Sequence, residues 1–244
     1  MLPITSQADT APRPRLNING YNCIGKHIGM VLVVGAPLFI GAGTLRWDWG
    51  WIFTLVTLTG WVVLSLILVH ANPELLNERG KWMKDLAGTK RWDWVIMTVY
   101  SVLLIATPLV AGLDCRYAWS PPTSAGIKVT GIVLLVVGFL LLTWSMAVNR
   151  FFVATVRVQT DREHRVTASG PYRFVRHPGY VAVILHFIAI PMSLGTFMAW
   201  IPALLGAGLF VLRTWLEDRT LQAELPGYAD YAQRTRYRLL PGVW

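Results

Sequence analysis

The stretch Ser169–Tyr180 concentrates the side chains in this chain that are best suited to chemistry. It holds two tyrosines, two arginines and a histidine at the mouth of an apolar segment. Pro178 favours the first turn of a helix, where free backbone N–H groups meet the positive end of the helix dipole. His177 and Tyr180 flank that helix start, so it would suit a carboxylate or another anion. The alternative is an interfacial histidine that only caps the helix.

A second candidate group follows further along the chain. Arg213 and Glu217 stand at positions i and i+4, which places them on one face of a helix, and Asp218 comes directly after them. Taken alone, the pair is better explained as an ordinary intrahelical ion pair at a membrane boundary. A shared site with His177 is favoured if the fold brings both segments to the same end of the molecule.

The elements that position these groups must be membrane helices. Of the 244 residues, 54% are hydrophobic and 14% are charged, whereas soluble domains have roughly 25% charged residues. This composition predicts an all-α, polytopic integral membrane protein. The net charge of +9 then marks cytoplasmic loops and not a nucleic-acid partner. Cys23 and Cys115 fit neither a disulfide framework nor a metal site.

Four stretches are long and apolar enough to cross a bilayer, which takes about 20 residues. Tryptophans gather at their ends, as they do at membrane interfaces. Residues 1–26 are polar and lack the pattern of a signal peptide, so we expect a polar N-terminal tail. The four predicted spans are His27–Leu45, Trp51–Val69, Trp94–Leu113 and Ile127–Val148.

The last apolar region, Val181–Leu212, is too long for one ordinary span. Pro191, Gly195 and Pro202 interrupt it. A split near Gly195 gives two arms of about 15 residues, or about 22 Å each at helical rise. We therefore expect a tight helical hairpin that returns the chain to the side it left.

Basic residues test this topology. Of the 22 Lys and Arg residues, all but Arg46, Arg116 and Lys128 fall on one side, including Arg13, Lys84, the loop 150–177 and the C-terminal segment. The positive-inside rule assigns that side to the cytoplasm. We therefore expect a multi-pass protein, in the inner membrane if bacterial, whose site faces the cytoplasm.

The connecting segments carry further local signals. Pro73 can open a helix within the loop Asn72–Arg91, which otherwise reads as a cytoplasmic linker. The Gly-Ala-Gly triplets at 41–43 and 206–208 lie inside apolar stretches, which favours close helix packing over a dinucleotide site. The basic, aromatic segment 226–238 is interpreted as a membrane-surface helix, with a lid as the alternative.

From about Asn149 to Pro241 the chain resembles the isoprenylcysteine carboxyl methyltransferase family of integral membrane enzymes, kin to the phospholipid N-methyltransferases. The first 148 residues are similar only as a set of spans. Four motifs in the right order carry the resemblance: His164–Tyr172, Arg176–Tyr180, Arg213–Glu217 and Gly227–Tyr231.

The resemblance implies a cofactor, S-adenosylmethionine, and an acceptor faced by Arg213. Glu217 and Asp218 stand where the family often has two glutamates, so either carboxylate could be the cofactor contact. No metal is implied. The cofactor-binding residues that the resemblance implies are Gln159, His164, Arg165, Val166, Thr167, Tyr172, His177, Pro178, Gly179, Tyr180 and Glu217. Gln159 is the weakest of these, because its spacing from His164 is shorter than in the eukaryotic enzymes.

The chemistry of this cofactor agrees with the residue types. A sulfonium and an ammonium need carboxylate or aromatic partners, such as Glu217 and the tyrosines. Methyl transfer is an in-line displacement, so alignment matters most. A carboxylate acceptor needs no base, and Arg213 would orient it bidentately. We therefore expect a lipophilic acid, small molecule or lipid, as the acceptor, with membrane lipids as neighbours.

Two other functions are compatible with parts of the pattern. An NADPH-dependent sterol-type reductase also ends in an Arg-His-Pro-x-Tyr segment, but Gly179 and Val181-Ala182 stand where those enzymes have asparagine and Gly-Glu. A non-catalytic scaffold would use the basic tail to bind anionic lipid. The expected organisation is a tail (1–26), a four-span scaffold (27–148) and a methyltransferase region (149–244) with the hairpin 181–212 and a cytoplasmic C-terminal helix.

Overall fold

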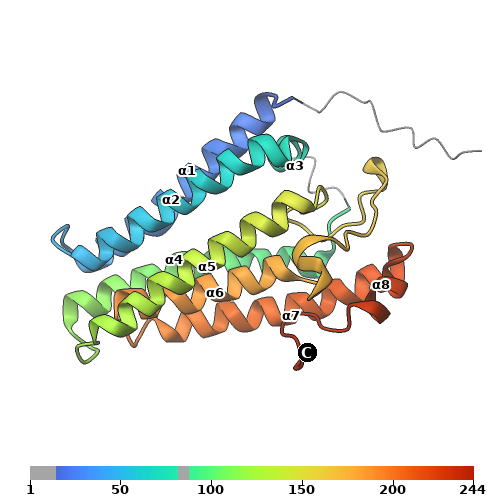
Figure 1. Cartoon of the computed structure of the whole chain (residues 1–244). Coiled ribbons are helices and arrows are strands. Elements are labelled where there is room, and N and C mark those ends of the chain that lie inside the picture. Colours follow the sequence, from blue (N-terminus) through green and yellow to red (C-terminus); the bar gives the residue numbers. More distant parts are fainter. Residues whose placement is uncertain (1–14, 82–87) are drawn as a thin grey trace, which may run out of the picture.

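A computed structural model describes residues 15–81 and 88–244, and in these residues all regular structure is helical (Figure 1). The prediction of an all-α membrane protein is therefore confirmed. Two short 3-10 turns lie between α5 and α6, at Thr160–Arg162 and Gly170–Arg173. The α-helices are α1 (Ile18–Ala42), α2 (Asp48–Ala71), α3 (Pro73–Arg79), α4 (Arg91–Tyr117), α5 (Ala125–Val148), α6 (Pro178–Leu194), α7 (Trp200–Glu224) and α8 (Tyr228–Arg234).

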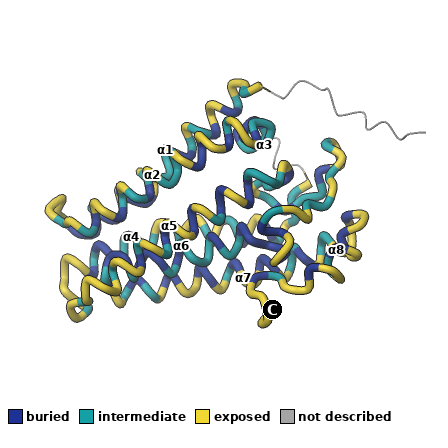
Figure 2. Tube along the Cα trace, viewed as in Figure 1, coloured by how far each residue is buried: buried dark blue, intermediate teal, exposed yellow. Residues whose placement is uncertain are grey.

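Four of these helices, α1, α2, α4 and α5, are long and apolar enough to span a membrane. They correspond to the four predicted spans, so a multi-pass membrane protein is confirmed. Figure 2 shows exposed residues along the outer faces of the bundle and buried ones where helices meet. Large apolar side chains such as Leu32, Leu140 and Ile201 are exposed on those outer faces, as a lipid-facing surface requires.

The first helix begins earlier than the sequence indicated. Ile18 opens α1 inside the stretch expected to be a polar tail, because the Asn17 side chain caps the helix by accepting from the N–H groups of Asn19 and Gly20. Asn77 of α3 also fixes this start, since its side chain accepts from Asn17 N and donates to Arg15 O, both at 3.0 Å. Residues 1–14, with Arg13, lie outside the described residues, as does Lys84.

The predicted hairpin divides where the sequence indicated. Gly195 ends α6 in the left-handed conformation, with φ at 69°, which glycine adopts without steric cost. The arms are longer than expected, at 17 residues in α6 and 25 in α7. Figure 1 shows both arms running beside α4 and α5, so the second arm brings Arg213 and Glu217 back to the end where α6 begins.

Glycines let α1 and α4 cross at backbone contact near the opposite end. A Cβ on Gly41 would lie 2.5 Å from Leu109 O, and one on Gly112 would lie 2.1 Å from Leu38 O. The packing role predicted for Gly41 is therefore confirmed. Gly206 behaves similarly, because a Cβ there would lie 2.5 Å from the Phe187 ring.

One end of the bundle gathers almost all of the functional candidates. It collects α3, the loop 149–177, the start of α6, the end of α7 and α8 (Figure 1). The other end has three short connections, at 43–47, 118–124 and 195–199. Arg46, Arg116 and Lys128 are the basic residues at this end. The fold thus separates a polar, loop-rich end from a sparse one, in agreement with the predicted charge asymmetry.

Candidate functional site

A cavity of about 680 Å³ runs from the loop-rich end into the helix bundle. Its outer part is lined by polar and aromatic residues, and its inner part by apolar side chains of α1, α2, α4, α5 and α6. Tyr180, Arg213 and Glu217 belong to the same lining as the polar outer residues and the apolar inner residues. Of the predicted cofactor residues, the ones that line the cavity are His164, Arg165, Val166, Thr167, Tyr172, His177, Gly179, Tyr180 and Glu217.

Asn149, at the end of α5, organises the start of the loop 149–177. Its side-chain oxygen accepts from the backbone N–H of Phe151 at 2.9 Å and from the Thr167 hydroxyl at 3.3 Å. Its amide nitrogen donates to the Tyr172 hydroxyl at 3.0 Å. One asparagine therefore holds Thr167 and Tyr172 against the same wall of the cavity.

Gln159 has a different position from the one expected. Its side chain is fully buried and does not belong to the cavity lining. It donates to Phe151 O at 2.8 Å and accepts from Arg162 at 2.6 Å, while its backbone N–H reaches His164 Nδ1 at 3.3 Å. These contacts favour a role for Gln159 in holding the loop 149–177 in place and not in binding a ligand directly. Pro178 also lies outside the lining and opens α6.

His164 is held as a neutral imidazole. Burial, and then the positive charges of Arg162 and Arg157, lower its pKa from 6.5 to about 4. Because Nδ1 accepts from Gln159 N, the proton of the neutral ring belongs on Nε2. The ring packs against Phe151 with centroids 4.4 Å apart. The residue is thus an uncharged donor beside the cavity.

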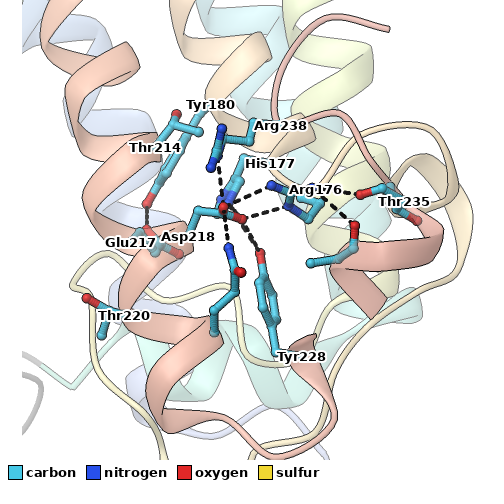
Figure 3. Close-up of polar contacts among 12 residues, drawn as sticks. Arg176, His177, Tyr180, Thr214, Glu217, Asp218, Thr220, Tyr228, Thr235 and Arg238 are labelled. Atoms are coloured by element: carbon cyan, nitrogen blue, oxygen red, sulfur yellow. Dashed lines mark hydrogen bonds and ion pairs between the residues drawn. The ribbon is translucent and has the colours of Figure 1, made fainter. Parts of the chain in front are cut away.

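Asp218 is the centre of a buried polar cluster (Figure 3). Its carboxylate is 0% exposed and accepts from Arg176 at 2.7 and 2.9 Å and from Arg238 at 2.8 Å. His177 Nε2 lies 3.3 Å from Asp218 Oδ1, and the Tyr228 hydroxyl lies 3.1 Å from that oxygen. Burial alone would raise the pKa of Asp218, but hydrogen bonds from His177, Arg176 and Arg238 hold it well below its usual range.

The C-terminal segment completes this cluster through its backbone. Arg176 N donates to Tyr237 O at 2.9 Å, and His177 N donates to Arg238 O at 3.0 Å. The Arg176 guanidinium also donates to the carbonyls of Thr235 and Arg236, each at 2.8 Å. The segment expected to be a surface helix or a lid therefore packs against the start of α6 as a fixed wall.

Glu217, one residue before Asp218, faces the cavity. It accepts a hydrogen bond from the Tyr180 hydroxyl (Figure 3). The Tyr180 ring lies parallel to the His177 ring, with centroids 5.6 Å apart and 7° between the planes. Of the two carboxylates left open by the sequence, Glu217 is therefore the one available to a ligand, because Asp218 is absent from the cavity lining.

Arg213 does not pair with Glu217, the alternative that its spacing left open. Its Nε donates to Asp93 Oδ1 at 2.8 Å and its Nη2 donates to Asp93 Oδ2 at 3.2 Å. Nη2 also donates to Ala154 O at 2.7 Å. Asp93 was not among the predicted site residues, because the tryptophans around it indicated a membrane interface just before a span beginning at Trp94. A carboxylate in the first turn of a membrane helix was the available signal.

Tyr228 and Tyr231 of α8 also line the cavity. They belong to a motif that carried the resemblance, but they were not among the predicted site residues. Burial raises the pKa of Tyr231 to about 12. Burial, followed by the charges of Asp218 and Glu217, raises the pKa of Tyr228. Both phenols therefore remain protonated, and both donate within the protein, Tyr228 to Asp218 and Tyr231 to Tyr172 O.

Comparison with known proteins agrees with this geometry. No curated protein matches the chain. Residues 131–223, from α5 to the end of α7, match the model of the isoprenylcysteine carboxyl methyltransferase (ICMT) family. That range contains Glu217 and Arg213 but leaves α1 to α4 and α8 outside it. The resemblance seen in the sequence is thereby confirmed over residues 131–223, which are similar to this family of methyltransferases and lie within a multi-pass membrane protein.

Proposed function

We propose that the protein is an S-adenosylmethionine-dependent methyltransferase that modifies a lipophilic acceptor, for which a carboxylate is the favoured group. One observation carries this proposal. One cavity has a polar, aromatic outer part and an apolar inner part. Tyr180, Arg213 and Glu217 line the same cavity as the residues of these two parts. A hydrophilic cofactor and a hydrocarbon chain would each have a matching environment, with the reacting groups between them.

The donor set fits this cofactor. Bound there, S-adenosylmethionine supplies a methyl group on a sulfonium, which is a cation, together with an ammonium and a carboxylate. Glu217 and the ring faces of Tyr172 and Tyr228 provide partners for cations. At the start of α6, the N–H groups of His177 and Tyr180 already donate to carbonyls, which leaves the backbone N–H of Gly179, a cavity-lining residue, as the donor for an anion. The neutral His164 and the segment 165–167 remain for the uncharged parts of the molecule.

Arg213 serves the acceptor through one nitrogen and not through a bidentate fork. Asp93 and Ala154 O occupy Nε and Nη2. Among residues 15–81 and 88–244, none accepts a hydrogen bond from Nη1, and Arg213 lines the cavity. Nη1 can therefore orient one oxygen of an acceptor. A carboxylate suits this arrangement because it is already nucleophilic and needs no general base.

The apolar inner part accounts for a lipophilic acceptor. Phe53, Leu104, Leu135, Phe139 and Phe187 line it at the depth of the spans. A hydrocarbon chain there would bury apolar area at about 25 cal/mol per Å². We infer that the acceptor enters from the bilayer, that the cofactor enters from the cytosol, and that the loop-rich, basic end faces the cytoplasm.

The test is cofactor binding followed by product identification. The purified chain in lipid nanodiscs should bind S-adenosylmethionine in calorimetry, and His177→Ala and Glu217→Ala should each weaken binding at least about tenfold. Arg219→Gln is the matched control, because Arg219 is exposed on the same helix and stacks on Trp215. Radiolabelled methyl transfer to membrane lipids and lipophilic acids or thiols, with mass spectrometry, identifies the acceptor.

Three results would overturn the proposal. They are no binding by the wild type, variants indistinguishable from it, and oxidation of NADPH by the purified chain. Salt-sensitive liposome binding that is unaffected by Tyr172→Phe or Glu217→Ala, without methyl transfer, would indicate a lipid-binding scaffold instead.

A further inference from the structure

Asp93 is a fully buried carboxylate in the first turn of α4, outside the range that matches the family. It accepts from Arg213 through both oxygens, and Oδ2 also accepts from the backbone N–H of Val156 at 2.8 Å. One side chain thus joins the start of α4, the loop after α5 and the inner face of α7. This carboxylate is not itself part of the cavity lining.

The charges around Arg213 explain what this carboxylate achieves. The Arg213 side chain is 5% exposed, and its guanidinium carbon lies 5.1 Å from the centroid of the Tyr180 ring. Tyr180 in turn donates its hydroxyl to Glu217, one helical turn beyond Arg213. Two carboxylates therefore flank one buried cation, and Asp93 takes the contact with it. A buried guanidinium without a carboxylate is strongly unfavourable, so the partner for Arg213 must be one of the two.

Loss of Asp93 would leave Glu217 as the nearby replacement. Positions i and i+4 on a helix are within reach of a direct ion pair. A Glu217 carboxylate paired with Arg213 would have its charge compensated inside the protein. Its attraction for a cationic ligand in the cavity would then fall, although the shape of the cavity would stay nearly the same.

We propose that Asp93 is a positioning residue that keeps Arg213 away from Glu217, so that the Glu217 carboxylate stays free for a cation of the cofactor. The same contact occupies Nε and Nη2 of Arg213 and leaves Nη1 without an acceptor among the described residues. The inference rests on the proposed function, because it names the charge that the site recognises. It also predicts that the fourth helix, and not only the family-matched range, determines cofactor affinity.

The experiment separates charge from shape with three ligands. S-adenosylmethionine carries a sulfonium and an ammonium, S-adenosylhomocysteine only the ammonium, and 5′-methylthioadenosine neither cation. In Asp93→Asn, calorimetry on the full chain in nanodiscs should show S-adenosylmethionine weakened about tenfold and 5′-methylthioadenosine less than about twofold. Whether S-adenosylhomocysteine follows the first or the second ligand shows which cation Glu217 faces.

A second pair of variants distinguishes positioning from structure. Arg213→Met in the Asp93→Asn background removes the cation that would capture Glu217, so S-adenosylmethionine affinity should recover toward the wild type. Asp93→Glu keeps the charge and should retain most of the affinity. A residue with only a structural role would instead give a further loss in the double variant.

Two outcomes overturn the inference while the proposed function stands. One is an equal loss for all three ligands in Asp93→Asn, and the other is a double variant weaker than the single one. Binding of 5′-methylthioadenosine near the wild-type level shows that the variant is folded. If the wild type binds none of the three ligands, the proposed function itself fails, which is a separate result.

Discussion

At the scale of single residues, two adjacent carboxylates have opposite environments. Neighbouring positions on a helix point about 100° apart, so Glu217 faces the cavity and Asp218 faces the packed core of the loop-rich end. Asp218 is saturated by Arg176, Arg238 and their neighbours, whereas within residues 15–81 and 88–244 Glu217 has one phenol as its hydrogen-bond partner. Chain position alone could not separate the two roles, because the sequence shows only two acidic residues side by side.

Replacement of each carboxylate should therefore affect a different property. Asp218→Asn leaves Arg176 and Arg238 without a compensating charge and should lower the free energy of unfolding by about 3 kcal/mol or more. Glu217→Gln should change it by less than about 1 kcal/mol. Denaturant unfolding of both variants in detergent measures the difference. A stable Asp218→Asn protein would contradict the assignment of Asp218 as a structural centre.

His164 makes stability depend on pH in a defined direction. Its folded pKa, about 4, lies below the ordinary value of 6.5, so the unfolded chain binds more protons between these values. Stability should therefore fall as the pH falls from about 6.5 toward 4. The depressed pKa of Asp218 has its effect only below the ordinary carboxyl range, outside this window.

The measurement is the melting temperature between pH 7 and pH 5 for the wild type and for His164→Gln. The variant should lose less stability over this interval, and the difference between the two proteins isolates His164 from other titrating groups. Parallel curves would show that His164 titrates normally in the folded protein.

At the scale of elements, apolar runs and the positions of glycine and proline predicted most of the helices. Uninterrupted apolar runs indicated the four spans, Gly195 indicated the division of the hairpin, and Pro73 indicated the short helix α3. The start of α1 was wrong, because Asn17 caps a polar first turn that has no apolar periodicity. Arg213 and Asp93 could not be paired in advance, since that contact depends on how α4 packs against α7.

The crossing of α1 and α4 gives a sharp test at this scale. Gly112→Ala would place a Cβ 2.1 Å from Leu38 O, and backbone cannot move aside as a side chain would. The free energy of unfolding should fall by about 2 kcal/mol or more. Gly208→Ala is the matched control, because nothing lies within 4 Å of its Cβ and alanine is the better helix former. Equal effects would show that the crossing is not tight.

At the scale of the whole molecule, charge asymmetry anticipated which segments share an end. Arg46, Arg116 and Lys128 do lie at the end opposite the cavity mouth. Hydropathy and charge report on each segment separately, so they could place the candidate residues at one end. They could not show that a continuous cavity links that end to the interior, which depends on how the helices pack against one another.

The proposed orientation can be tested with the native thiols. Cys115 is exposed near the end of α4, away from the cavity, and Cys23 is buried. A membrane-impermeant maleimide should label Cys115 in intact cells or right-side-out vesicles. A cysteine introduced as Arg219→Cys in a Cys115→Ser background should react only after permeabilisation. The reverse pattern would place the cavity mouth outside the cytoplasm.

The Asp93–Arg213 contact also bears on how such a protein can change through evolution. The family-matched range contains the cation but takes its neutralising carboxylate from a helix outside that range. The range is therefore not a portable module. Grafted onto another set of spans, it would need an acidic residue at the same depth of a neighbouring helix. Among homologues, positions 93 and 213 should accordingly be exchanged together or not at all.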